Sequence, residues 1–193
     1  MKIKITFFGI LMFITLVVTH SYVSLAAFVA AFIHEIGHLI AARACGIRIK
    51  ELKLDIFGAV MTPEQSISSY RSEAILAFAG PLFNILSVVF IALIGVDRGN
   101  VLSLFITASM FLGILNLLPI ESFDGGRILY CLLASMISLD FANNICNVLS
   151  FLVALSLWIF SVYLLLRLGS SLSLFVFSYA LICRILLSVK KID

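Results

Sequence analysis

Long apolar runs, separated by short polar breaks, dominate the pattern of this 193-residue chain. A run of about 18 or more predominantly apolar residues is enough for an α-helix to cross a bilayer core of about 30 Å. Each of the longer runs meets this length, so each predicts one transmembrane helix. They are residues 23–44, 73–94, 101–118, 141–166 and 172–189.

A shorter apolar run, residues 5–18, follows Met1-Lys2-Ile3-Lys4 at the N-terminus. A signal peptide begins in the same way, with a basic end before an apolar stretch. However, no convincing small-residue cleavage site follows the run, and the next apolar helix begins at once. We therefore favour a short first transmembrane helix over a signal peptide.

One stretch does not follow the helical pattern. Residues 47–57 alternate apolar and polar side chains, which is strand periodicity, and a second short segment lies between Gly58 and Pro63. This predicts a small membrane-associated β-hairpin or sheet beside the helix over 23–44. We thus expect an all-α polytopic membrane protein with about six transmembrane helices and one small β-element, forming a single domain over residues 1–193.

Composition supports the membrane assignment and excludes several classes of function. The chain is 63% hydrophobic and 12% charged, with a mean hydropathy of +1.21. Soluble domains carry about 25% charged residues, so an integral membrane protein is predicted. The net charge of +3 comes from scattered basic residues, which argues against nucleic-acid binding. Four cysteines stand singly, without C-x-x-C spacing, which favours small buried hydrophobes over a disulfide framework or a zinc knuckle.

The distribution of Lys and Arg predicts the orientation, because cytoplasmic loops carry an excess of these residues. With six alternating helices and a cytoplasmic N-terminus, only Arg98 and Arg167 of the 13 basic residues fall on the outer side. Both termini are therefore predicted to be cytoplasmic. In this topology His38 lies roughly 9 Å from the inner end of its helix, at about 1.5 Å per residue.

The candidate chemistry is concentrated in the helix over 23–44, where His34, Glu35 and His38 form the motif H-E-x-x-H. Residues four apart share one face of a helix, so the two histidines can hold one metal ion between them. Glu35 can take a proton from a water on that metal. Ionisable side chains are costly at membrane depth, which indicates a function for them.

A catalytic zinc site takes three protein ligands and one open position. The only other histidine is His20, at the far end of the predicted first helix, so we expect a carboxylate as the third ligand. Asp124 follows a helix break after Pro119, and Gly125-Gly126 allows close backbone approach. Asp124 could instead cap the helix that it begins. Glu121 is the competing ligand, but we favour Asp124.

Two asparagines, Asn84 and Asn116, stand in otherwise apolar predicted helices. Interhelical hydrogen bonding is one explanation. The other is that one or both donate to a substrate carbonyl or to its developing oxyanion. The pattern alone does not decide between these two roles.

Three motifs on successive predicted helices resemble those of the site-2 protease family of intramembrane zinc metalloproteases (peptidase family M50). They are H-E-x-x-H from His34 to His38, G-P-L-F-N from Gly80 to Asn84, and N-L-L-P-I-E-S-F-D-G-G-R from Asn116 to Arg127. The resemblance covers about residues 23–138, the three-helix catalytic core of that family. The layout is most similar to the branch of the stage IV sporulation protein FB.

The resemblance implies a zinc metalloendopeptidase with one Zn²⁺ per chain. His34, His38 and Asp124 would be the zinc ligands and Glu35 the general base, while Asn84 and Asn116 would match the family's asparagines near the site. A bacterial cell or forespore membrane is the implied location. No PDZ or CBS domain is expected, whereas many members of the sporulation branch carry a CBS domain. Family members also often have a proline near Ser122.

By resemblance, the partners would be a membrane-embedded or membrane-tethered protein substrate and a membrane-bound inhibitor or regulatory subunit. A sporulation sigma-factor precursor is the substrate suggested by the branch, in a pathway of regulated intramembrane proteolysis. Cleavage would occur near the cytoplasmic side. We also hypothesise that residues 47–57 hold an unwound substrate segment by strand addition.

The alternative from another class is a non-proteolytic membrane metal-binding regulator or transporter. A transporter is expected to spread its intramembrane polar residues along a path, often in repeated halves. Here they gather at one depth and no internal repeat is visible, so the protease is favoured.

Overall fold

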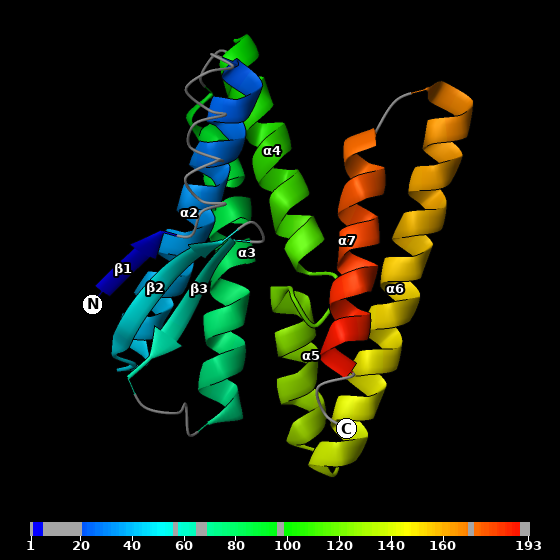
Figure 1. The fold of residues 1–193 in the computed structure, drawn as a ribbon. Helices are drawn as coiled ribbons and strands as arrows, with labels where there is room; N and C mark the ends of the chain where they lie inside the picture. The colour runs from blue at the N-terminus through cyan, green and yellow to red at the C-terminus, as the bar shows by residue number, and fades with distance from the viewer. Residues whose placement is uncertain are drawn as a thin grey trace. The chain divides into compact units, whose positions relative to one another are not determined.

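The computed structural model describes residues 2–5, 21–55, 58–64, 69–95, 99–169 and 172–189 (Figure 1). Most of this part of the chain is helical. The helices are α2 (Tyr22–Ala44), α3 (Tyr70–Ile94), α4 (Asn100–Asn116), α5 (Asp124–Ala134), α6 (Leu139–Leu168) and α7 (Leu172–Val189). The strands are β1 (Lys2–Ile5), β2 (Ile49–Asp55) and β3 (Gly58–Pro63). The chain divides into two compact units, Met1–Leu117 and Leu118–Asp193.

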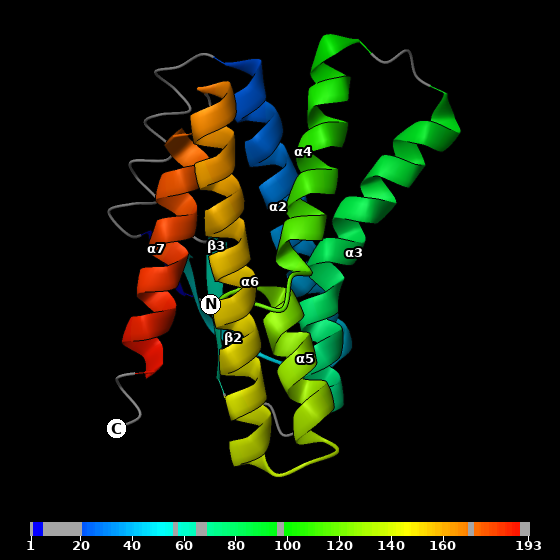
Figure 2. The ribbon, with the colours of Figure 1, turned by 90° about the vertical axis from the view of Figure 1, so that its right-hand side faces the viewer.

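In the first unit, α2, α3 and α4 pack against one another. Small residues allow this close approach, as is common between membrane helices. A Cβ added at Gly37 of α2 would lie 2.6 Å from the carbonyl oxygen of Ala79 in α3. Gly113 of α4 likewise packs on α3, near the Pro81 carbonyl, and α3 and α4 diverge toward the C-terminal end of α3 (Figure 2).

The predicted β-element is present as a three-stranded sheet in the order β1-β2-β3. β1 runs parallel to β2, and β3 runs antiparallel to it. Ahead of β2, Gly46 ends the turn after α2 in the left-handed region, with a φ of 69°. Ile47 and Ile49 then pack against Ala41, Ala42, Leu76 and Ala79 of α2 and α3. The sheet therefore starts directly against the helix pair.

The prediction for the N-terminus is wrong at Ile5, which ends β1 instead of beginning a helix. Lys2-Ile3-Lys4-Ile5 alternates polar and apolar residues, and β2 provides its hydrogen-bonding partner, pairing Ile5 with Leu54. The rest of the predicted first helix, residues 6–18, lies outside the described part of the chain, as does His20.

In the second unit, α6 packs against both α5 and α7. The hydroxyl oxygens of Ser161 and Ser178, both fully buried, are 3.1 Å apart and join α6 to α7. The helix break predicted after Pro119 is present, since α5 begins at Asp124. A Cβ at Gly126 would collide with the Ile120 carbonyl, so glycine is required where the chain turns back on itself.

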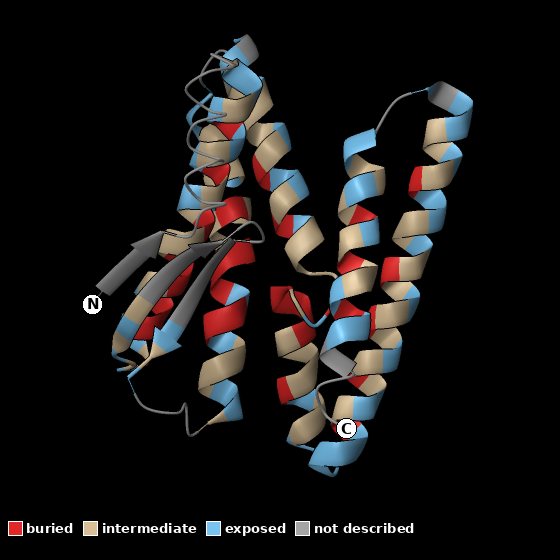
Figure 3. Ribbon diagram, in the orientation of Figure 1, coloured by how far each residue is buried: buried red, intermediate tan, exposed pale blue. Residues whose placement is uncertain are grey.

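Three described helices are long and apolar enough to cross a membrane: α2, α3 and the stretch Leu139–Arg167 of α6. Many large apolar residues of these helices are exposed, for example Leu93 and Leu166 at 80% each. Exposed positions recur along the length of the helices (Figure 3). Exposed apolar side chains in this number are expected where helices contact lipid or another protein. None of the four cysteines, all within the described part of the chain, forms a disulfide bond.

Candidate metal centre

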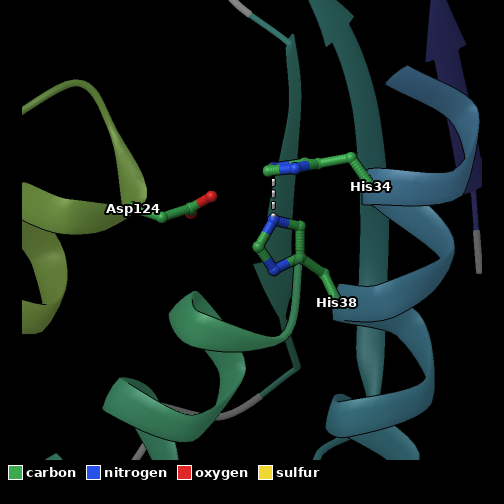
Figure 4. Close-up of side chains that lie close together, drawn as sticks. All are labelled: His34, His38 and Asp124. Carbon is green, nitrogen blue, oxygen red and sulfur yellow. Dashed lines mark hydrogen bonds between the residues drawn. The ribbon is translucent and has the colours of Figure 1, made fainter. Parts of the chain in front are cut away.

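Two buried histidines of α2 face each other across one helical turn. His34 and His38 are 5% and 6% exposed, and their Nε2 atoms lie 3.1 Å apart (Figure 4). Two nitrogen ligands of one tetrahedral zinc, each at about 2.0–2.1 Å from the metal, would be separated by about 3.3 Å. The pair therefore has the spacing of two ligands of a single ion.

The backbone of α3 sets the tautomer of His38. Its Nδ1 lies 2.7 Å from the carbonyl oxygen of Leu76. Because a carbonyl only accepts hydrogen bonds, Nδ1 carries the proton and donates it, which leaves the lone pair on Nε2. A ligating histidine is usually held by such a bond from its other ring nitrogen. His38 is thus prepared to bind metal through Nε2.

Gly80 of α3 makes room for the two imidazoles. A Cβ added there would lie 2.7 Å from Nε2 of His34 and nearer still to Nε2 of His38. Real Cβ atoms are not found this close to other heavy atoms, so any side chain at position 80 would occupy the space in front of the two Nε2 atoms. The residues present fit a metal ion, because space remains open where the two nitrogen atoms converge.

Asn84, one turn after Gly80, completes this cluster. It is fully buried, and its Nδ2 lies 3.4 Å from Nδ1 of His34. Its Oδ1 is buried without a hydrogen-bond partner among the described residues. The structure thus places Asn84 against a histidine of the H-E-x-x-H motif, a contact that the sequence did not reveal.

Glu35 follows His34 in α2 and is half-buried. At about 3.6 residues per turn, its side chain leaves the helix roughly 100° away from that of His34. Glu35 therefore borders the histidine face rather than forming part of the close pair.

Asp124 is the first residue of α5 in the second unit, and it is 7% exposed (Figure 4). The N-cap position belongs to Phe123, whose side chain makes no capping hydrogen bond. Asp124 itself stands in the first turn of α5, where a carboxylate interacts favourably with the helix dipole. Glu121, the competing candidate, is exposed.

The segment before Asp124 is held within its own unit. The hydroxyl oxygen of Ser150, in α6, accepts a hydrogen bond from the Glu121 backbone N–H at 2.9 Å. The same hydroxyl group donates to the Pro119 carbonyl at 3.4 Å. Phe123 stacks on Phe177 of α7 with ring centroids 6.4 Å apart. These contacts position the start of α5.

Asn116 ends α4 and is half-buried. Its Nδ2 donates to the Leu112 carbonyl of the same helix at 3.1 Å. Within the first unit, the structure thus brings together His34, His38 and Asn84, while the hydrogen bond from the Asn116 amide to Leu112 stays within α4.

Sequence reasoning missed the Leu76 carbonyl and the role of Gly80. A backbone acceptor leaves no signature in the residue type, so the bond to Leu76 could not be predicted. Gly80 did carry a signal, because glycine in the middle of an apolar helix indicates close packing. The identity of its neighbours, the two histidines, required the structure.

Comparison with known proteins adds an independent observation. A model of peptidase family M50 matches residues 22–99 and 96–160. This region contains α2 to α5 and most of α6, and with them every candidate site residue.

Two curated proteins illustrate the similarity. The stage IV sporulation protein FB of Bacillus subtilis is 29% identical over 159 residues, which are 79% of this chain and 55% of that protein. Rip3 of Mycobacterium tuberculosis, named as a candidate zinc metalloprotease, is 34% identical over 104 residues, 49% of this chain and 26% of Rip3. The chain thus spans about a quarter to a half of the length of these relatives.

Among solved structures, a site-2 protease from Methanocaldococcus jannaschii has a similar fold. The TM-score is 0.68 with 21% sequence identity, and the match covers 93% of this chain and 87% of that chain.

Proposed function

Because this integral membrane chain belongs to peptidase family M50, we propose that it is an intramembrane zinc metalloendopeptidase. The observation that carries the proposal is the buried histidine pair in α2, a helix long and apolar enough to cross a membrane. Two imidazole donors at this depth need a functional reason, because polar groups inside a membrane are costly. A shared zinc ion supplies that reason.

The zinc ligands that we propose are His34, His38 and Asp124. All three side chains are buried. Phe123 rather than Asp124 occupies the N-cap of α5, and Glu121 is exposed, which supports Asp124 over its competitor. Two nitrogens and one carboxylate leave the fourth zinc position open, as a catalytic site requires.

Zinc bound there would polarise the scissile carbonyl and lower the pKa of a coordinated water to about 7. Glu35 would then take the proton of the attacking water and pass it to the leaving amine. The half-buried position of Glu35 suits this role, since it borders the face of α2 that carries His34 and His38. Of the two asparagines, Asn116 is the one that we propose to donate a hydrogen bond to the developing oxyanion.

The substrate class that we propose is a membrane-embedded or membrane-tethered protein, cut near the cytoplasmic side. The Lys and Arg distribution supports this orientation, with both termini in the cytoplasm. A sporulation sigma-factor precursor is the first substrate to test, because the match to the stage IV sporulation protein FB covers 79% of this chain. A membrane-bound inhibitor or regulatory subunit is the partner expected for such a protease.

The test is to reconstitute the purified chain in liposomes with a membrane-tethered substrate. Cleavage is expected to stop on chelation and to return when zinc is restored. A chain that binds zinc but never cleaves any member of a panel of tethered substrates would instead be a metal-binding regulator or transporter.

A further inference from the structure

We propose that Asn84 is a positioning residue for His34, holding Nδ1 of its imidazole so that Nε2 presents its lone pair to the metal. This inference rests on the proposed zinc site and assigns Asn84 a role other than contact with the substrate. All groups that carry it lie in α2, α3 and α4 of the first unit.

The position of Asn84 is closely determined by its surroundings. The residue is fully buried. Ser87 donates from its hydroxyl group to the backbone carbonyl of Asn84 at 2.7 Å, one turn along α3. On the other side, a Cβ at Gly113 of α4 would lie 3.5 Å from Cβ of Asn84. The amide therefore points toward Nδ1 of His34 from a packed backbone.

Without a metal, the hydrogen-bond roles can be followed from Leu76 to Asn84. His38 donates from Nδ1 to the Leu76 carbonyl, so its Nε2 is an acceptor. Nε2 of His34 then donates to Nε2 of His38, at a distance of 3.1 Å. A neutral imidazole that carries its proton on Nε2 has an acceptor at Nδ1, which matches the Nδ2 donor of Asn84 at 3.4 Å. In this state Oδ1 of Asn84 is left without a partner.

Binding metal through His34 reverses these roles. Nε2 must lose its proton to present a lone pair, so the neutral ring carries its proton on Nδ1. An Nδ1–H needs an acceptor, and Nδ2 of Asn84 cannot accept. A half-turn of the amide exchanges Nδ2 for Oδ1 at nearly the same place, because the two atoms are almost equal in size. Oδ1 then accepts from Nδ1 and is no longer unpartnered.

Asparagine is suited to both states, since one end of its amide donates and the other accepts. Aspartate at this position would match only the metal-bound form, and leucine would match neither. A role in substrate binding makes a different prediction, because loss of the amide would then weaken substrate binding or catalysis without changing metal affinity.

The experiment compares metal binding by the full chain and its variants in detergent, using Co²⁺ titration against a competing chelator and the visible absorption of bound Co²⁺. For Asn84→Leu we expect about 10- to 100-fold weaker binding and an altered Co²⁺ spectrum, the range found for loss of an outer-shell partner. Asn84→Asp should retain wild-type affinity or exceed it. Ser109→Ala is the control, because Ser109 is a fully buried serine in α4 whose hydroxyl group has no hydrogen-bond partner among the described residues.

The outcomes separate the inference from the site on which it rests. Failure of the wild type to bind Co²⁺ or Zn²⁺, or full binding by His34→Ala, would remove the zinc site itself. If the wild type binds metal and Asn84→Leu binds it equally well, the positioning role is overturned. It is also overturned if Asn84→Asp is as weak as Asn84→Leu, since restoring an acceptor should restore binding. If Asn84→Leu does not fold, Asn84→Ala replaces it with the same expected loss.

Discussion

The imidazole of His38 is tied to the backbone of α3, because its Nδ1 donates to the carbonyl oxygen of Leu76 at 2.7 Å. One ligand of the proposed zinc site is therefore aligned by a helix that contributes no ligand. The alignment depends on close packing of α2 and α3, which Gly37 permits by its approach to Ala79. Substitutions that separate these helices should weaken metal binding without touching a ligand.

Gly80→Ala tests whether the space in front of the two imidazoles is needed for metal binding. The added methyl group would lie 2.7 Å from Nε2 of His34 and would force the imidazoles apart. Overpacking of this kind costs about 1–3 kcal/mol of stability, and we expect zinc content, measured by mass spectrometry, to fall well below one per chain. Gly113→Ala is the matched control, since its Cβ would meet its neighbours at ordinary distances of 3.5 Å or more. Full zinc content in Gly80→Ala would contradict the assigned role of Gly80.

Asp124→Ala removes a proposed zinc ligand. Loss of an outer-shell partner weakens metal binding by about 10- to 100-fold, and we expect a larger loss of zinc affinity for Asp124→Ala. Glu121→Ala, three residues earlier and exposed, should bind zinc normally. Chelator competition with both purified variants provides the measurement. The reverse order of affinities would identify Glu121 as the third ligand.

Gly126→Ala should displace the start of α5, because its methyl group would collide with the Ile120 carbonyl. We expect a loss of about 1–3 kcal/mol in stability, together with weaker zinc binding. Gly99→Ala is a suitable control, since a Cβ there meets nothing within 4 Å. Thermal unfolding in detergent compares the two variants, and equal stability would show that the turn before α5 tolerates a side chain.

Ser150→Ala removes the hydroxyl group that bonds to both Glu121 and Pro119. Removing this partner from two part-buried backbone groups should cost up to about 1–3 kcal/mol, so the variant should unfold at a lower temperature than the wild type. Ser156 is an exposed serine of the same helix whose hydroxyl group donates to the Leu152 carbonyl, so Ser156→Ala should change stability by less than about 0.5 kcal/mol. Similar melting temperatures for the two variants would show that Ser150 does not hold the segment.

Much of the helical fold could be predicted from the chain, because apolar runs of membrane-spanning length have few alternatives to a helix. The break after Pro119 and the start of α5 at Asp124 also followed from local chemistry, since proline interrupts a helix and Gly125-Gly126 permits a close turn. The H-E-x-x-H spacing places His34 and His38 on one face of α2 in any regular helix.

Other features depended on partners that are distant in the sequence. The strand at Lys2–Ile5 exists because β2 pairs with it, and an apolar run beginning at Ile5 hid this short alternation. The hydrogen bond from His38 to Leu76 and the contact between Asn84 and His34 both join α2 to α3. The residues of these pairs are 38 and 50 positions apart in the chain. A local sequence pattern cannot predict contacts between residues so far apart in the chain.

The strand-addition hypothesis also changes with the structure. β2 is the central strand, with β1 on one side and β3 on the other, so it offers no open edge. A substrate segment adding to the described strands would have to pair with β1 or β3. Ile49→Pro or Leu54→Pro would disrupt the sheet itself, because proline cannot donate a backbone hydrogen bond within a central strand.

The central claim is that the chain cleaves peptide bonds with Glu35 as general base beside a metal-binding histidine pair. The most direct measurement compares wild type and Glu35→Gln, both loaded with zinc, on one membrane-tethered substrate. Loss of a general base lowers the rate by about 10²- to 10⁴-fold, and zinc content should stay unchanged. Undiminished cleavage by Glu35→Gln would contradict the account.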